Sequence, residues 1–252
     1  MHRFFVPPEW LGPQQAEIGA PVARQIATVL RLTPGDRVCL LDDSGWEIEV
    51  ELGEVRTNRI AAVVVRRSLA TSEPRLKVTV YQGLLKGDKF EWVLQKCTEL
   101  GAMAFVPLLT ARTVVGAVGE ADNQRWRRWQ RIIQEAAEQC QRGRLPALRV
   151  AQLFAAACEG AGGALSLIPW EGEKERSLRA ALRQSLDGAP GRRPFTVNLF
   201  IGPEGGFTES EVKLARRHGI IPVSLGRRVL RAETAAVVAT AAVLHEAGDL
   251  DP

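Results

Sequence analysis

A glycine-rich stretch, IGPEGGF at residues 201–207, joins an apolar run to a segment with helical periodicity. Gly205 and Gly206 can adopt positive φ and let a ligand approach the main chain closely. The sequence lacks G-x-G-x-x-G and the G-K-S/T of a phosphate loop, so these glycines form neither a dinucleotide nor a triphosphate motif. Two interpretations stay open: a loop that wraps a small ligand with main-chain groups, or a tight strand-to-helix turn.

A second stretch, SLGRRVLRAETA at residues 224–235, repeats this arrangement of a predicted strand, a glycine and a predicted helix. Gly226 follows the strand, and Arg227, Arg228 and Arg231 crowd the loop that leads to the helix. Cations are unfavourable near a helix N-terminus because they oppose its dipole. The three arginines therefore favour an anionic partner over a purely structural role.

The elements around these loops predict an α/β domain with a parallel sheet. Apolar runs predict strands at 76–85, 103–110, 164–170, 195–202 and 220–226, and helical spacing predicts helices at 86–102, 123–143, 177–186, after 207 and at 232–248. Their alternation is typical of a parallel sheet covered on both faces. Ligands of such sheets bind beyond the carboxyl ends of the strands, where IPWEGEK (168–174) supplies a third loop with Trp170 and Glu171. Thr208 and Glu211 predict a capping box for the helix after IGPEGGF.

The N-terminal part has a different pattern. Short strands are predicted at 37–43, 46–52 and 59–65, with strict period-two alternation in the second, and one helix is predicted at 20–32. The segment SLATSEP (68–74) is small, polar and closed by proline, as linkers are. We therefore expect a small β-barrel domain at 1–70 and an α/β domain at 74–252.

Composition narrows the classes of function. The net charge is only +4, but residues 112–149 hold eight arginines and four acids, which allows an RNA surface or a solvated helical face. None of the four cysteines forms a C-x-x-C pair, and the three histidines are scattered, so we expect reduced core thiols and no metal site. No signal peptide or long apolar run is present, and a cytoplasmic protein without a membrane partner is the expectation.

Taken together, IGPEGGF and LGRRVLRAETA resemble the SPOUT methyltransferases, specifically the RsmE family of ribosomal RNA (uracil-N3)-methyltransferases. The resemblance extends over nearly the whole chain. MHRFF (1–5), VLRLTPGD (29–36), KGDKFEWVLQKCTELG (86–101) and RWQRIIQEAAEQCQRGRLP (128–146) are similar to further signatures of this family.

This resemblance implies a PUA-like barrel followed by a SPOUT domain with a trefoil knot. It implies S-adenosylmethionine as cofactor, uridine N3 of 16S ribosomal RNA in the small ribosomal subunit as target, a homodimer and no metal. The residues that it implies for the cofactor site are Trp170, Glu171, Ile201, Gly202, Pro203, Gly205, Gly206, Leu225, Gly226, Leu230 and Thr234.

A role in catalysis is expected for Arg231, which could stabilise the uracil anion or contact a phosphate. Glu204 or Glu233 could accept the proton, or each could only stabilise its own segment. The residues expected to bind RNA are Arg3, Arg24, Arg31, Arg131, Glu135, Gln139 and Arg142. Family members commonly carry histidine where this chain has Gln25, which we interpret as an RNA-contact position of the accessory domain.

Two other functions remain possible from the sequence. The first is a SPOUT enzyme that methylates another RNA position, since the same cofactor loops would serve. The second is an RNA-binding protein of this fold without catalysis, for which bare glycines in the cofactor loops would have no use. Trp126 and Trp129 could stack on bases, but we expect them to pack against neighbouring side chains.

Overall fold

The computed structural model describes residues 1–114, 123–186 and 196–251, and the chain divides into two compact units. The first unit comprises Met1–Glu73 together with Gln134–Leu145, and the second comprises Pro74–Ile133 together with Pro146–Pro252. Helix α3 (Asn123–Gln139) therefore contributes residues to both units. A linear division of the chain at residues 70–74 does not include this return to the first unit.

The first unit is built on a mixed five-stranded sheet with the order β1-β3-β4-β5-β2. Its elements are β1 (His2–Phe5), η1 (Pro8–Trp10), β2 (Gln15–Gly19), α1 (Val22–Arg24), η2 (Gln25–Leu30), β3 (Arg37–Leu41), β4 (Trp46–Val55) and β5 (Arg59–Leu69). Strands β1 and β3 are parallel, and the other neighbours are antiparallel. Alternate residues of β4, such as Ile48 and Val50, are buried in the core of this sheet, as the period-two pattern predicts.

The helix predicted at 20–32 is shorter and less regular than expected. It consists of one α-helical turn, α1, followed by the π-helical segment η2, and it ends at Arg31, whose φ is 54°. Ala23 and Ile26 are buried against the sheet, whereas Gln25 is exposed. The exposure of Gln25 leaves its side chain available for a partner outside the unit.

The C-terminal part of α3 belongs to the first unit because both its apolar and its polar side chains find partners there. Ala137 packs in a small cluster with Phe5, Cys39 and Leu41. The Glu138 carboxylate accepts a hydrogen bond from the Phe5 amide at 3.0 Å. Burial raises the pKa of Glu138, while hydrogen bonds from Gln134 and the Phe5 amide oppose that shift.

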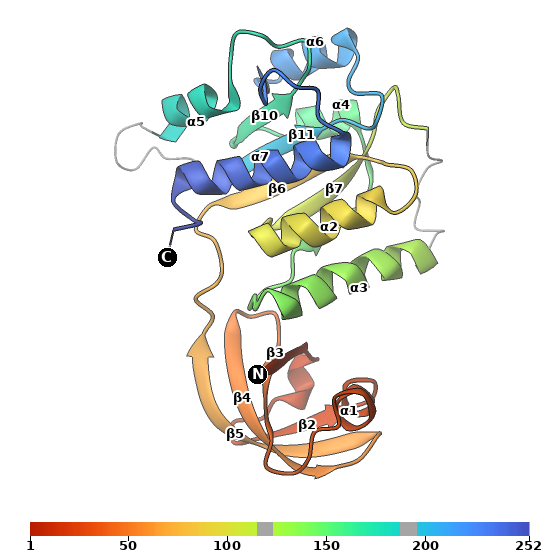
Figure 1. Ribbon diagram of the computed structural model, residues 1–252, viewed down its shortest axis with the longest axis vertical. Coiled ribbons are helices and arrows are strands. Elements are labelled where there is room, and N and C mark those ends of the chain that lie inside the picture. The colour runs from red at the N-terminus through yellow and green to blue at the C-terminus, as the bar shows by residue number, and fades with distance from the viewer. Residues whose placement is uncertain (115–122, 187–195, 252) are drawn as a thin grey trace. The chain divides into compact units, whose positions relative to one another are not determined.

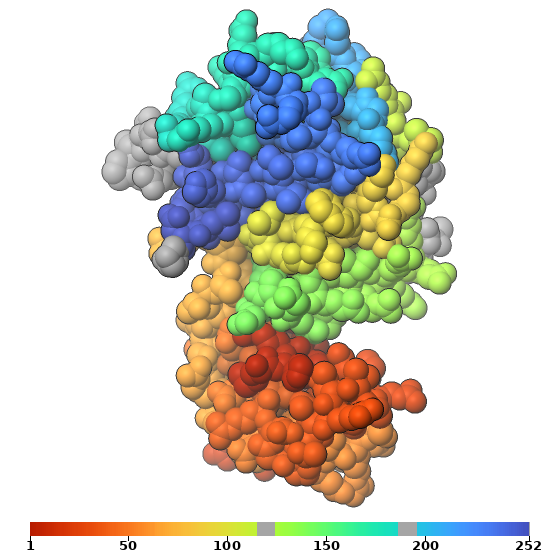
Figure 2. Space-filling view, in the orientation of Figure 1, coloured from red at the N-terminus to blue at the C-terminus, as the bar shows by residue number. Residues whose placement is uncertain are grey.

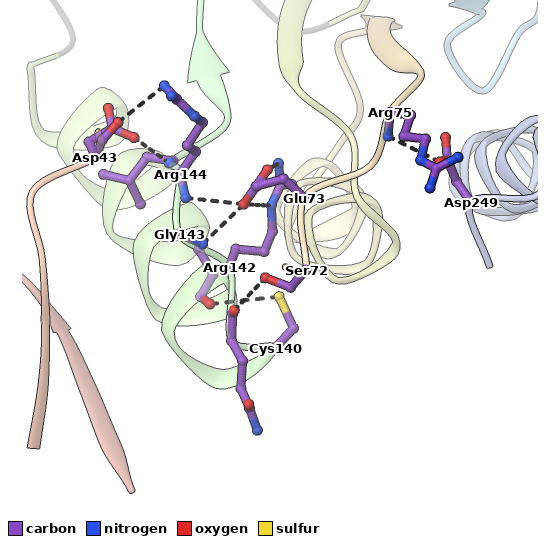
Figure 3. A network of polar contacts seen from close by, with 12 residues as sticks. Asp43, Ser72, Glu73, Arg75, Cys140, Arg142, Gly143, Arg144 and Asp249 are labelled. Carbon is purple, nitrogen blue, oxygen red and sulfur yellow. Dashed lines mark hydrogen bonds and ion pairs between the residues drawn. The ribbon is translucent and has the colours of Figure 1, made fainter. Parts of the chain in front are cut away.

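The segment that follows α3 is held by the carboxylate of Glu73 (Figure 3). This carboxylate forms an ion pair with the Arg142 guanidinium at 2.8 Å and accepts hydrogen bonds from the amides of Gly143 at 3.0 Å and Arg144 at 3.1 Å. The Arg142 side chain is only 2% exposed. Arg142 therefore stabilises the first unit, and its predicted contact with RNA is wrong because its charge is buried and paired.

The second unit contains a seven-stranded sheet with the order β12-β10-β11-β6-β7-β8, in which β9 also pairs with β7. All of its pairings are parallel. The strands are β6 (Lys77–Gly83), β7 (Ala104–Leu109), β8 (Ala147–Leu148), β9 (Gln152–Leu153), β10 (Leu165–Pro169), β11 (Thr196–Ile201) and β12 (Ile221–Val223). The predicted parallel α/β architecture is confirmed, although Phe195 of the predicted strand 195–202 lies outside the described residues.

Helices cover both faces of this sheet. They are α2 (Lys89–Leu100), α4 (Phe154–Glu159), α5 (Leu178–Leu186), α6 (Glu209–Arg217) and α7 (Ala232–Ala247). One core joins the sheet to α2, α5 and α7, and a second core on the opposite face joins it to α4 and α6. Figure 1 shows α2 and α7 in front of β6 and β7, and Figure 2 shows α5, α7 and α2 as one continuous surface.

The carboxyl end of the chain returns to the start of the second unit. The Asp249 carboxylate, just after α7, accepts hydrogen bonds from the amides of Arg75 at 3.0 Å and Leu76 at 2.8 Å (Figure 3).

Two aromatic pairs also match expectation, since Trp129 is buried against Phe90 at 4.4 Å between ring centroids and Trp126 packs on Trp129. No helix in the described ranges is long and apolar enough to span a bilayer.

The cysteine side chains give a simple prediction about accessibility. All four thiols are free, and burial raises the pKa of Cys97 and of Cys158 to about 12. Cys39 is also buried, whereas Cys140 is partly exposed. Because the thiolate is the reactive form, we expect a disulfide reagent at neutral pH to label at most Cys140 in the native protein and all four thiols after denaturation. Rapid labelling of a second native thiol would contradict this packing.

Candidate functional site

A pocket of about 290 Å³ lies in the second unit where β10, β11 and β12 end. Its walls come from the loops after these three strands and from the start of α7. The lining residues are Lys89, Pro169, Trp170, Glu171, Lys174, Ile201, Gly202, Pro203, Glu204, Gly206, Phe207, Ser224, Leu225, Gly226, Arg227, Arg228, Val229, Leu230, Arg231, Ala232, Glu233 and Ala235. The three loops that the sequence singles out therefore meet at one site, at the sheet edge where open α/β sheets bind ligands.

The first loop is held very close to the neighbouring strand β6. A Cβ atom on Gly83 would lie 2.5 Å from the Pro203 nitrogen, so only glycine fits at that position. The side-chain amide of Gln82 donates hydrogen bonds through Nε2 to the carbonyl oxygens of Gly83 at 3.0 Å and Gly202 at 3.2 Å. A turn in which the Gly206 amide donates to the Pro203 carbonyl at 2.9 Å then reverses the chain, and Gly206 has a φ of +68°.

The capping box predicted at the end of this loop is confirmed. The Thr208 hydroxyl accepts from the Glu211 amide at 3.2 Å, and the Glu211 carboxylate accepts from the Thr208 amide at 2.8 Å. The second Glu211 oxygen accepts from the Ala111 amide at 2.8 Å. These bonds fix the start of α6 and hence the far end of the loop.

Two residues expected at the cofactor site do not line the pocket. The Arg112 side chain occupies the space beside the Gly205 Cα, 3.2 Å from the position that a Cβ atom there would take, and the Arg112 guanidinium donates to the Gly205 carbonyl at 2.6 Å. Thr234, in the first turn of α7, is partly exposed but is absent from the lining, whereas its neighbours Glu233 and Ala235 belong to it. Gly206 and Gly226, rather than Gly205, thus present bare main chain to the pocket.

Glu204 lines the pocket but is already engaged by basic groups. Its carboxylate accepts from the Lys86 amide at 2.9 Å and pairs with the Lys89 ammonium at 3.3 Å. Partial burial raises the pKa of Glu204, but hydrogen bonds from the Lys86 and Glu204 amides and from Lys89 outweigh that effect and lower it overall. A carboxylate with a lowered pKa is a weak proton acceptor, so this geometry favours the structural role of Glu204.

The loop before α7 brings basic side chains to the same pocket. Gly226 has a φ of +114°, and no atom lies within 4 Å of the place where its Cβ would be. Arg227, Arg228 and Arg231 are exposed and line the pocket. Arg231 is the residue at the N-cap of α7, but its side chain makes no capping hydrogen bond. Its guanidinium therefore serves neither as a helix cap nor as part of the core.

The third loop closes the pocket near Gly206. The Trp170 amide donates to the Val223 carbonyl at 3.0 Å, and the Trp170 ring covers Gly172 so closely that a Cβ atom there would overlap it. A Glu171 carboxylate oxygen lies 3.8 Å from the position that a Cβ of Gly206 would take. The loops after β10 and β11 are therefore neighbours in space.

The residues expected to bind RNA divide into three groups. The Arg3 side chain is largely buried and paired with Glu47, so the prediction that it binds RNA is wrong, as it is for Arg142. Arg24 and Arg31 are exposed on the first unit. Arg131, Glu135 and Gln139 are exposed along α3, as the helical spacing predicts.

Comparison with known proteins identifies the family. Residues 71–244 match the RNA methyltransferase domain family. The ribosomal RNA small subunit methyltransferase E of Bacillus subtilis is 30% identical over 98% of this chain and 97% of its own length, and that of Synechocystis is 36% identical over 96% and 77%. The chain belongs to the ribosomal RNA small subunit methyltransferase E (RsmE) family. The sequence-based prediction of the RsmE family, and with it of an RNA methyltransferase, is confirmed.

A solved RsmE structure extends this result to the fold. The ribosomal RNA small subunit methyltransferase E of Neisseria gonorrhoeae, bound to S-adenosyl methionine, is 28% identical, covers 97% of both chains and superposes with a TM-score of 0.83. The two proteins therefore share a mixed α/β fold. In the described part of this chain, no cluster of three or more His, Cys, Asp or Glu side chains could hold a metal ion.

Two functional features of this RsmE-family chain were not visible in the sequence. Gly83 appears as an ordinary strand residue, yet the close approach of Pro203 depends on it. Lys89 appears as a helix-surface lysine, yet it lines the pocket and pairs with Glu204. The only sequence signal for Gly83 is a glycine at the end of an apolar strand, which often marks close backbone approach.

Proposed function

We propose that this protein transfers a methyl group from S-adenosylmethionine to N3 of a uridine in the 16S RNA of the small ribosomal subunit. The observation that carries the proposal is the pocket of bare main chain between loops 202–206 and 224–231. Family membership and the cofactor bound to the gonococcal relative support the choice of cofactor and of RNA as the substrate.

The residues present fit S-adenosylmethionine. Gly206 and Gly226 have positive φ and leave their main chain accessible, and an added side chain at either position would enter or border the pocket. Apolar side chains from Ile201, Leu225 and Leu230 can pack on an adenine ring, and the exposed Glu171 carboxylate can accept hydrogen bonds from amino or hydroxyl groups. When bound, this cofactor supplies an electrophilic methyl group on a sulfonium.

The chain must make the uridine nitrogen nucleophilic. Uracil N3 reacts only as its proton leaves, and the resulting anion spreads onto the two flanking carbonyl oxygens. Arg231, exposed in the pocket and without a capping bond, can stabilise that charge as an oxyanion donor does. Glu204 holds the cofactor loop through Lys86 and Lys89 rather than moving a proton.

We also propose the finer features that belong to this function. The mixed sheet of residues 1–70 supports a PUA-like barrel, and the loops 202–206 and 224–231 that meet before α7 support a trefoil knot in residues 74–252. Exposed apolar side chains on neighbouring helices, Trp92 of α2 and Val238 of α7, support a homodimer. Arg24, Arg31 and the exposed face of α3 would contact RNA, in the cytoplasm where ribosomes assemble.

The product defines the reaction. The purified protein is incubated with S-adenosylmethionine and small ribosomal subunits from a strain that lacks the activity, and the RNA is digested and analysed by mass spectrometry. We expect 3-methyluridine at one position. A different methylated nucleoside would indicate another RNA target, and cofactor-independent RNA binding without any product would indicate a binding protein.

Replacing Gly226 with valine is expected to weaken cofactor binding. A β-branched residue is disfavoured at a φ of +114°, and its side chain would occupy space in the pocket. We expect the Kd measured by calorimetry to rise at least about tenfold, or about 1.4 kcal/mol. Gly163→Val is the matched control, since Gly163 has a φ of +81° and open space beside it but lies outside the pocket. Equal losses in the two variants would assign the effect to backbone strain alone.

A further inference from the structure

The pocket contains one buried acid oxygen that lacks a partner. Glu233 lies in the first turn of α7 and lines the pocket. Its Oε2 atom is shielded from solvent and has no hydrogen-bond partner among the residues described. Buried carboxylate oxygens are normally paired, because leaving one unpaired forfeits its hydration without compensation. Because Glu233 lines the pocket, a rotation of its side chain can bring this oxygen to a hydrogen-bond donor on a ligand.

The other acids of the pocket differ from Glu233 in this respect. Glu204 accepts from the Lys86 amide and pairs with Lys89, and Glu171 is exposed. The basic groups around the pocket come from several segments: Lys89 from α2, Lys174 after β10, and Arg227, Arg228 and Arg231 before α7. No ion pair joins any of these five to Glu233 in the described structure, so no protein cation holds this acid. The cations of the pocket favour the anion that uracil forms when it loses its N3 proton.

We propose that Glu233 is the catalytic base that accepts the N3 proton of the target uridine. This inference rests on the proposed function and adds the proton acceptor to it. Uracil presents a carbonyl oxygen directly beside its N3–H, which is an acceptor next to a donor. Arg231 and Glu233, two residues apart at the start of α7, supply the complementary donor and acceptor.

The step balances with these groups alone. The N3–H proton passes to the Glu233 carboxylate, and the electron pair of that bond forms the new bond from N3 to the methyl carbon. The bond between this carbon and sulfur breaks, its electrons stay on the sulfur, and the sulfonium charge is lost. The neutral Glu233 then releases its proton to water through the pocket opening.

The test is Glu233→Gln, which keeps the shape of the side chain and removes the proton acceptor. Single-turnover methylation of small-subunit RNA at neutral pH is expected to slow about 10²- to 10⁴-fold. The residual rate should rise with pH in proportion to hydroxide, because uridine must then ionise without help. Calorimetry should give an unchanged affinity for S-adenosylmethionine, which also shows that the variant is folded. Glu233→Asp, which retains the carboxylate, should recover part of the rate with the pH dependence of the wild type.

A matched control is Glu246→Gln, the same change on the same helix but outside the pocket, where Glu246 pairs with Arg179 and Arg183. It should leave the methylation rate unchanged. A normal rate for Glu233→Gln would overturn the inference, and so would a rate loss that follows a loss of cofactor affinity, since Glu233 would then hold the cofactor. Wild-type protein that binds the cofactor yet forms no 3-methyluridine would instead overturn the proposed function, and this inference with it.

Discussion

Replacing Arg231 with alanine is expected to lower kcat for RNA methylation about 10²- to 10³-fold, the loss found when one oxyanion donor is removed. The guanidinium lines the pocket and makes no capping hydrogen bond, so its removal leaves α7 intact. Cofactor affinity should change little, because the pocket offers main chain from other segments for that purpose. Steady-state kinetics with small-subunit RNA and calorimetry with S-adenosylmethionine measure the two effects separately.

The alternative role of Arg231, a contact with an RNA phosphate, gives a different result. In that case KM for RNA would rise, kcat would be unchanged, and the salt dependence of RNA binding would decrease in slope by about one. Arg183→Ala is the matched control, because Arg183 is an exposed arginine of α5 that pairs with Glu246 outside the pocket. An unchanged kcat for Arg231→Ala would remove this residue from the chemical step.

The fold of the second unit could be predicted from sequence because its strands are buried on both faces. Strand β11, for example, has four apolar residues among its six, is buried at five of them, and is followed by a capped helix, α6. Helix α4 was not predicted, because its six residues are too few for a clear helical period. The return of α3 to the first unit was also not predicted, since it depends on Glu73 and Phe5, which are distant in sequence.

The candidate site could be predicted as far as main chain determines it. The loops after β10, β11 and β12 meet because parallel strands end at one edge of the sheet, and that geometry follows from element order alone. Side-chain partners do not follow from element order. The pairing of Glu204 with Lys89 and the cover of Gly205 by Arg112 each join segments that are far apart along the chain.

The arginine-rich region also shows that side-chain partners cannot be predicted from the sequence. Sequence gives the number of guanidinium groups but not which of them are buried. Arg131 is exposed on α3, whereas Arg142, eleven residues later, is buried against Glu73. The net charge of a segment therefore overestimates the surface that it offers to RNA, because buried ion pairs contribute to the count and not to the surface potential.

Replacing Glu73 with alanine is expected to lower the free energy of unfolding by about 3–5 kcal/mol, the cost of breaking a buried ion pair by removing one partner. The Arg142 side chain is 2% exposed and that of Glu73 17%, so solvent would screen little of the loss. The amides of Gly143 and Arg144 would lose the same acceptor. Urea denaturation should show a lower midpoint with an unchanged slope.

Glu54→Ala provides the matched control within the same unit. Glu54 pairs with Arg56 on the surface, with side chains 70% and 66% exposed, and such pairs contribute at most about 1 kcal/mol. Equal losses for the two variants would mean that the Glu73 carboxylate is no more than a surface contact. A loss confined to Glu73→Ala would show that this carboxylate is a principal anchor of the segment after α3, which Asp43 and Ser72 also hold through hydrogen bonds. The stability of the first unit would then depend on residues up to Leu145, and not only on those before the linker.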